Sequence, residues 1–268
     1  MPLPTLHKTP TTLIIAAAES TWIFSTISGK IISWKKYKTE LFHSSLGPEF
    51  DVNRAETDND RRHDAVDWKE KVIHLSKGYT KSVAWSINAS DSSIGVIVET
   101  TLAPLALSWR RTPPPHATSH WIHNGLPQSF NKVEWFGRGP GESYKDKKLS
   151  RLFGNWTSTV EKLFTNYEFP QEGSNRTDVR WVKLDSGEAS IKAKFGKQDG
   201  FSFTATHYTW QDLYESKHPH DLREKKKEYI VLRLDSDHHG LGSGSCGPKT
   251  REEYALKPRN FEFEIKLE

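Results

Sequence analysis

Short runs in which apolar and polar residues alternate recur along the chain, and this pattern constrains the fold more than any other feature. The alternation is clearest at residues 191–195, 201–205, 230–234 and 261–267. A period of two places every second side chain on the same face of an extended strand. We therefore predict that each of these runs is a strand with one face against a core.

Aromatic and β-branched residues strengthen this prediction. Aromatic residues make up 12% of the chain, including ten tryptophans, and such side chains fit half-buried strands better than helices. One β-hairpin is expected near the N-terminus, because a short turn at Ser28 and Gly29 separates the β-prone runs 22–24 and 31–37.

Helical signals are sparse. The clearest candidate is residues 209–216 (TWQDLYES), where Thr209 is a plausible N-cap, Asp212 follows three residues later, and Pro219 limits any extension. Strands at regular spacing with polar turns and almost no helix are typical of a sandwich. The sequence therefore predicts an all-β fold, a large antiparallel β-sandwich. The length of 268 residues is compatible with one large domain or two smaller ones.

One segment is atypical. Residues 105–124 (LALSWRRTPPPHATSHWIHN) contain three consecutive prolines, and proline cannot donate to the hydrogen-bond ladder of a sheet. The segment is therefore not expected to be a central strand. It is interpreted as a surface loop, or as a defect in the sequence such as a retained intron or a frame shift.

Charge and cysteine content argue against several classes. The formal net charge is only +4 and the basic residues are scattered, so nucleic-acid binding is not expected. The basic run at residues 223–227 is interpreted as a solvated face or loop. Cys246 is the single cysteine, which allows neither an internal disulfide nor a Cys-rich zinc site and favours a cytoplasmic location. The apolar run at residues 13–18 is too short to span a membrane, and no export signal is expected.

Two glycine-rich stretches are candidates for special backbone geometry. VEWFGRGPGESY at residues 133–144 carries Gly137, Gly139 and Gly141 but lacks the G-K-[ST] ending of a phosphate loop. It is interpreted as a tight turn whose glycines adopt backbone angles closed to other residues. GLGSGSCGP at residues 240–248 has four glycines, which allow close approach to another strand or to a ligand.

Side chains with catalytic or metal-binding chemistry form no recognisable pattern. Five histidines gather in the last quarter of the chain without an HExxH motif, so no metal site is expected: His207, His218, His220, His238 and His239. Glu142 and Glu172 could be paired as the two carboxylates of a glycoside hydrolase. Nothing in the sequence indicates that they meet.

Five motifs in a fixed order carry a more specific resemblance. Together they resemble the C-terminal domain, or small chain, of family 2 glycoside hydrolase β-galactosidases (lactases), and the resemblance covers residues 6–268 as one domain. The motifs are NRAETDND (53–60), VEWFGRGPGESYKDKK (133–148), YEFPQEGSNRTDVRWVKL (167–184), HYTWQDLYESKHPHDL (207–222) and GLGSGSCGP (240–248).

The resemblance implies a supersandwich of the galactose mutarotase-like type and a non-catalytic role. The catalytic glutamates of the family lie on a (β/α)8 barrel, so no catalytic residue is expected in this chain. The Mg and Na ions of family enzymes bind to other domains, so no cofactor is expected here. The implied partner is a large barrel-bearing subunit, or the missing N-terminal domains.

The resemblance also implies a substrate-binding loop at residues 240–248. In some family members a tryptophan on this loop packs against galactose, and here Cys246, flanked by Ser245 and Gly247, takes its place. The smaller thiol would leave a wider pocket for a β-D-galactoside. The alternative is a lone cysteine buried in the core.

Other functions remain open from the sequence. The chain could be a stand-alone galactoside-binding module, because mutarotase-like sandwiches have a concave face and this chain has aromatic side chains to stack on sugar rings. An aldose 1-epimerase is a further alternative, and it would need a paired glutamate and histidine across the sandwich. The last alternative is a pseudogene product that never folds.

Overall fold

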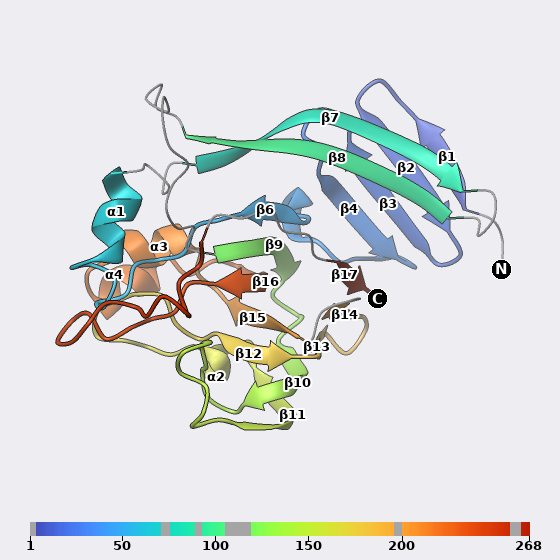
Figure 1. Cartoon of the computed structure of the whole chain (residues 1–268). Coiled ribbons are helices and arrows are strands. Elements are labelled where there is room, and N and C mark those ends of the chain that lie inside the picture. The colour runs from blue at the N-terminus through green and yellow to red at the C-terminus, as the bar shows by residue number, and fades with distance from the viewer. Residues whose placement is uncertain (1–3, 71–75, 89–92, 105–118, 196–199, 258–263) are drawn as a thin grey trace.

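The structure is a computed structural model that describes residues 4–70, 76–88, 93–104, 119–195, 200–257 and 264–268. Within these residues the chain is mostly β, and neighbouring strands pair antiparallel. The predicted all-β, antiparallel fold class is confirmed. Figure 1 shows the sheets, with short helices gathered at one end.

Two five-stranded sheets form the centre of the fold. The first core sheet has the order β11-β10-β13-β14-β17, and the second core sheet has the order β12-β15-β16-β9-β6. Their strands are β6 (Glu49–Asp51), β9 (Ser119–Pro127), β10 (Lys132–Gly139), β11 (Leu152–Thr159), β12 (Arg176–Val179), β13 (Trp181–Asp185), β14 (Ser190–Phe195), β15 (Phe201–Thr206), β16 (Tyr229–His238) and β17 (Ile265–Leu267).

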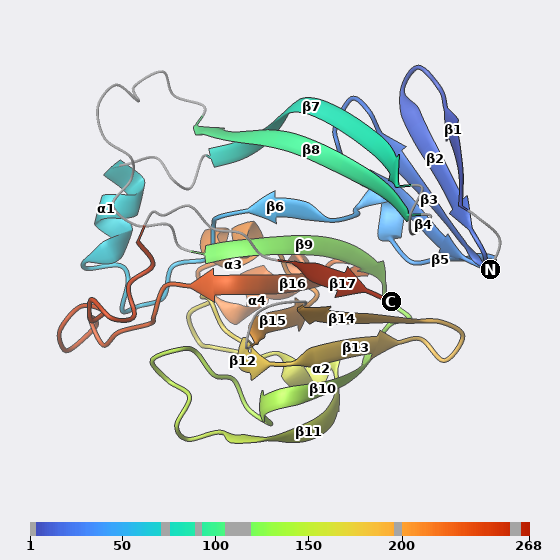
Figure 2. The same ribbon diagram turned by 45° about the vertical axis from the view of Figure 1, so that its right-hand side comes forward.

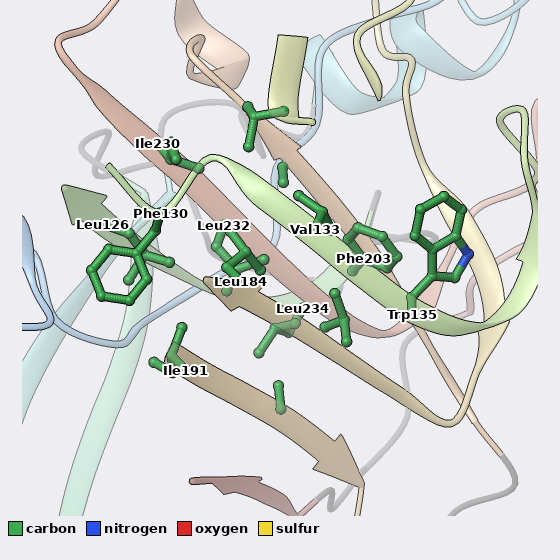
Figure 3. Close-up of a cluster of buried hydrophobic side chains, with 14 of the residues drawn as sticks. Leu126, Phe130, Val133, Trp135, Leu184, Ile191, Phe203, Ile230, Leu232 and Leu234 are labelled. Atoms are coloured by element: carbon green, nitrogen blue, oxygen red, sulfur yellow. The ribbon is translucent and has the colours of Figure 1, made fainter. Parts of the chain in front are cut away.

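The main core lies between these two sheets, as Figure 3 shows. Val133 and Trp135 of β10 face Phe203 of β15 and Leu232 and Leu234 of β16, and all five are almost completely buried. Burying one such side chain contributes about 1.5–3 kcal/mol to folding. The strands predicted at 191–195, 201–205 and 230–234 are confirmed. Of the run 261–267, Phe261 and Phe263 lie outside the described residues.

A second group of strands lies beside the core sheets. β1 (Thr5–Lys8), β2 (Thr12–Ala17), β3 (Ser20–Ser25), β4 (Ile31–Lys36) and β5 (Thr39–Glu40) form an N-terminal sheet paired in sequence order. The predicted hairpin is confirmed as β3 and β4. Gly29 between them has a φ of 65°, which a residue with a side chain adopts only with strain.

Trp34 connects the N-terminal sheet to the main core. Its side chain is 5% exposed and belongs to the cluster between the core sheets. It stacks on Trp22 with ring centroids 6.0 Å apart and meets the ring of Phe42 edge-on. The short 3-10 helix η1 (His43–Ser45) follows β5.

A long hairpin formed by β7 (Ser76–Asn88) and β8 (Ser93–Pro104) crosses the N-terminal sheet, as Figures 1 and 2 show. The Thr80 hydroxyl donates to the Ser28 carbonyl at 2.6 Å. A Cβ added to Gly29 would lie 2.6 Å from Cγ1 of Val98. Because Gly29 has no side chain, the turn between β3 and β4 leaves space for Val98 of the long hairpin.

The described residues also include four short α-helices: α1 (Asp64–Glu70), α2 (Val160–Leu163), α3 (Trp210–Glu215) and α4 (Pro219–Glu224). The predicted helix is confirmed as α3, with Thr209 and Asp212 forming a capping box. Pro219 follows α3 and is the first residue of α4. Proline is tolerated at this position because the first backbone N–H of a helix has no helical acceptor, so its absence removes no hydrogen bond. Among the described residues, no helix has both the length and the apolar character needed to cross a membrane.

Two predictions need correction. Residues 119–124 of the proline-rich segment are not a loop: they lie in β9, a central strand between β16 and β6. The three prolines lie outside the described residues.

The predicted tight turn at Gly137, Gly139 and Gly141 is the second correction. Gly137 and Gly139 are inside β10, and neither these two nor Gly141 has a positive φ. They are needed for space, since a Cβ on Gly137 would lie 2.8 Å from Cα of Val179.

Candidate functional site

Contacts join the five sequence motifs to one another beside β16. Arg233 of β16 is the centre of this region, because its neighbours Leu232 and Leu234 point into the core and alternation turns Arg233 to the opposite face. Arg233 is buried. A buried guanidinium must be neutralised and hydrogen-bonded.

Two carboxylates neutralise Arg233. Its Nη1 donates to Oε2 of Glu172 at 3.0 Å, its Nη2 makes a very short contact with Oε1 of the same carboxylate, and its Nε donates to Asp235 at 3.1 Å. Burial acts to lower the pKa of Arg233, but the charges of Asp235 and Glu172 outweigh it and the pKa is raised. The Tyr144 hydroxyl also donates to Glu172, at 3.4 Å.

Glu142 lies in the same region with its own set of donors. Tyr167 donates a short hydrogen bond to Oε1, Lys147 donates to the same oxygen at 3.2 Å, and the Ser174 backbone N–H donates to Oε2 at 2.9 Å. Burial acts to raise the pKa of Glu142, yet the hydrogen bonds from Tyr167 and Ser174 and the charge of Lys147 leave it lowered.

The structure therefore brings Glu142 and Glu172 to one buried cluster, although nothing in the sequence indicated that they meet. Both contribute to the raised pKa of Tyr144, which is set mainly by burial. A glycosidase acid needs a raised pKa, whereas the pKa of Glu142 is lowered. Glu142 also forms an ion pair with Lys147, and Glu172 forms one with Arg233. Their arrangement suits a structural role.

Arg176 of β12 ties the GRGPG stretch to the third motif. Its guanidinium donates to the carbonyls of Pro140, Leu163 and Ser174 at 2.7–3.3 Å. Burial lowers its pKa to about 10. Buried Arg176 thus holds the first glycine-rich stretch from inside the protein.

The second glycine-rich stretch, residues 240–248, forms the glycine loop. At its base the Gly240 N–H donates to the Tyr254 carbonyl and the Gly242 N–H donates to Asp146, both at 2.8–2.9 Å. Arg54 donates to the Gly240 carbonyl at 3.3 Å while it pairs with buried Asp60. The NRAETDND motif therefore supports this loop across 186 residues of sequence.

The tip of the glycine loop carries the predicted binding residues. Ser245 is half-buried, and both its N–H and its hydroxyl donate to Oδ1 of Asn59. Gly247 and Cys246 are exposed, with their N–H groups donating to the Ser243 carbonyl. The Cys246 thiol is free and exposed, so the alternative of a cysteine buried in the core is wrong.

The histidines of the last quarter do not gather at one point. His238 is buried and accepts a hydrogen bond from the Lys145 N–H, and burial, with the nearby positive charge of Lys145, lowers its pKa strongly. His239 contacts Asp64 at 3.2 Å, whereas His218 and His220 stack on each other at the surface. In the described part of the chain, no three His, Cys, Asp or Glu side chains are placed to hold a metal ion.

An open groove lies beside the 57–60 turn that supports the glycine loop. Phe169 and Tyr214 line it with 38% and 40% of their surfaces exposed, together with charged side chains from α1 and α3 and the turns beside them. The Arg61 guanidinium lies 3.7 Å from the centre of the Phe169 ring. Sequence reasoning missed this groove and the role of Asn59, because both depend on contacts between distant motifs.

Comparisons with known proteins agree on one family. The family described as "Beta galactosidase small chain" matches residues 16–267. A β-galactosidase of Kluyveromyces lactis is 30% identical over 92% of this chain, and one of Arthrobacter sp. is 40% identical over 50% of it. The match covers 26% of the Kluyveromyces protein and 13% of the Arthrobacter protein. The chain thus spans about a quarter or less of the length of these relatives.

A solved structure of a galactose mutarotase-like protein from Lactobacillus casei aligns over 96% of this chain and 98% of its own length. The TM-score is 0.44 and the sequence identity is 8%.

Proposed function

The chain belongs to the β-galactosidase small-chain family, and from that premise we propose that it is the C-terminal part or small subunit of a β-galactosidase. In this role it completes a galactoside pocket whose catalytic glutamates come from a barrel-bearing partner. The chain itself supplies no catalytic group. The Mg and Na ions used by the family are bound by the partner, and the assembled enzyme works in the cytoplasm.

One observation carries this proposal: the glycine loop holds Cys246 at the surface on a supported turn. A side chain in a surface turn that is fixed from below can form one wall of a site built by two chains. The thiol is small and polarisable. It would pack against the sugar and leave a wider pocket than an indole would.

Co-expression with a large β-galactosidase chain lacking this domain tests the proposal. Hydrolysis of lactose is expected to appear only when both chains are present, and the isolated 268-residue chain is expected to hydrolyse nothing. No gain over the large chain alone would overturn the proposed role.

A Cys246→Trp variant tests the contact with sugar. The larger side chain is expected to change KM for lactose severalfold, whereas the free energy of unfolding stays the same because position 246 is exposed. His220→Trp on α4, also at an exposed position, is the control and is expected to leave KM unchanged. Equal KM values for Cys246→Trp and wild type would remove Cys246 from the pocket.

The aromatic groove favours a second candidate, a galactoside-binding module that acts alone. Phe169 and Tyr214 are partly exposed next to charged side chains, with Arg61 over one face of the Phe169 ring, and such a mixture of apolar and polar groups suits a pyranose ring with its hydroxyl groups. Calorimetry of the isolated chain with galactose or lactose distinguishes the two candidates. Heat of binding that disappears in Phe169→Ala supports the module, and absence of heat supports the completing role.

A further inference from the structure

We infer that Asn59 is the positioning residue of the glycine loop, and that through this loop it sets the width of the galactoside pocket. The first half of this inference concerns the loop alone. The second half rests on the proposed function. Asn59 lies in the NRAETDND motif, 186 residues before Ser245.

The side-chain amide of Asn59 bridges the two sides of the loop tip. Its Nδ2 donates to the Gly242 carbonyl at 2.9 Å. Its Oδ1 accepts from the Ser245 N–H at 3.1 Å and from the Ser245 hydroxyl at 2.7 Å. One planar group thus connects the residue that begins the turn with the residue directly before Cys246.

The chemistry of these partners requires an amide. A carbonyl oxygen can only accept and an N–H can only donate, so the bridging group must offer both functions at a fixed spacing. Aspartate would keep the acceptor for Ser245 but would direct a second oxygen at the Gly242 carbonyl. Alanine would remove all three hydrogen bonds and leave the Ser245 N–H without this partner.

Asn59 is itself held on a rigid turn. The Thr57 N–H and hydroxyl both donate to Oδ2 of Asp60, at 2.7 and 2.8 Å, and the Asp60 N–H donates to the Thr57 carbonyl at 3.1 Å. Asp60 is completely buried and pairs with Arg54 at 2.9 Å. The position of Asn59 is therefore fixed by the protein interior, and a fixed group can impose its position on the loop.

Close packing adds to the hydrogen bonds. A Cβ added to Gly244 would lie 2.5 Å from the Asn59 carbonyl oxygen and 2.8 Å from the ring of His63. The loop backbone thus lies directly against the 57–60 turn. Inside the loop, the closing contacts join Ser243 to Cys246, Gly247 and Pro248, and these do not determine where the tip lies relative to the protein.

The single cysteine allows a direct measurement of the mobility of the loop tip. A nitroxide spin label attached to Cys246 of the full chain reports the motion of the loop tip through its electron paramagnetic resonance spectrum. In Asn59→Ala the label is expected to move faster, with a rotational correlation time about two-fold shorter. Asn59→Asp, which keeps the acceptor for Ser245, is expected to give an intermediate value.

Two controls separate the bridge from general loss of structure. Asn155→Ala changes an exposed asparagine on β11 and is expected to leave the label mobility unchanged. Ser245→Ala removes one of the three hydrogen bonds and is expected to add little mobility on the Asn59→Ala background, because the two residues act through the same contact. If Asn59→Ala fails to fold by circular dichroism, Asn59→Asp and Ser245→Ala decide the result.

The same variants, assembled with the large chain, link the loop to catalysis. A raised KM for lactose with a nearly unchanged kcat in Asn59→Ala is expected if the loop is a pocket wall. A mobile label with unchanged KM would retain the positioning role and overturn the pocket. Wild-type mobility of the label in both Asn59 variants would overturn the positioning role itself, whatever the activity.

Discussion

Arg233 is buried together with the two carboxylates that neutralise it, Glu172 and Asp235. Removal of one charge from such a group leaves the remaining charges imperfectly balanced in a place that water does not reach. Glu172→Gln is therefore expected to lower the free energy of unfolding by about 3 kcal/mol. Urea denaturation followed by tryptophan fluorescence measures this.

Glu215→Gln is the matched control for that change. Glu215 pairs with Lys225 at 2.9 Å, but the Glu215 side chain is 62% exposed, and exposed pairs contribute little to stability. The control is expected to unfold like the wild type. Equal stability of both variants and the wild type would show that the buried group is not needed for folding.

His238 makes stability depend on pH. Burial, followed by the positive charge of Lys145, lowers the pKa of His238 well below its ordinary value of 6.5. Below pH 6.5 the unfolded chain therefore binds a proton that the folded chain does not. The free energy of unfolding is expected to fall between pH 7 and pH 5, with this residue contributing up to about 1.4 kcal/mol per pH unit.

A His238→Gln variant isolates this contribution. Glutamine can still accept the hydrogen bond from the Lys145 N–H but does not titrate. Urea midpoints at pH 7 and pH 5 are expected to differ less in this variant than in the wild type. His220→Gln, at an exposed position, is expected to keep the wild-type difference, and an unchanged difference in His238→Gln would contradict the assignment.

At the scale of single elements, β10 and β12 approach so closely that β10 has no space for a side chain at position 137. A Cβ on Gly137 would lie 2.8 Å from Cα of Val179, and a backbone atom cannot move aside cheaply. Gly137→Ala is expected to lower the free energy of unfolding by about 1–3 kcal/mol. Gly154→Ala, where the nearest atom would lie at 3.8 Å, serves as the control.

Thermal or urea unfolding of the two glycine variants measures the difference. Gly154→Ala on β11 is expected to change stability little, because an added methyl group there makes ordinary contacts. If the two alanine variants were equally stable, close approach would not explain the glycine at position 137.

Elements defined by local chemistry could be predicted from the sequence. Thr209 and Asp212 satisfy each other's backbone N–H groups, so α3 follows from four residues alone. Gly29 similarly marks the turn between β3 and β4. The central strand β9 was missed because the effect of the three prolines was extended to residues 119–124, which lie beyond them and contain no proline.

At the scale of the whole molecule, Trp34 connects the N-terminal sheet to the core between the two central sheets. Trp34→Ala is expected to cost about 3–5 kcal/mol because it leaves a cavity at this junction. Loss of the junction is also expected to let the N-terminal sheet unfold separately. Differential scanning calorimetry would then record two transitions where the wild type has one.

Trp181→Ala is the control at this scale. Trp181 is partly exposed on β13 and contacts Lys192, so its loss leaves the junction intact. A single transition at slightly lower temperature is expected. Two transitions in both variants, or in neither, would show that Trp34 does not couple the sheets.

The candidate site could be predicted only in part, for a physical reason. The order of the motifs indicated the family, and the resemblance to that family singled out Cys246, which the structure places at the surface. The contacts of Arg233 with Glu172 and of Asn59 with Ser245 join residues 61 and 186 positions apart. No local pattern determines such pairs, because they depend on how the sheets pack.

The support of the glycine loop by a distant motif limits how this enzyme family can be engineered. A loop from a relative, transplanted alone into this chain, would not be matched to Asn59, so the hydrogen bonds that hold its tip would not form. A successful transplant should include residues 53–60 from the same donor. Under the proposed function, substrate preference would then be inherited through two segments together, and natural variation at position 59 should accompany variation in the loop.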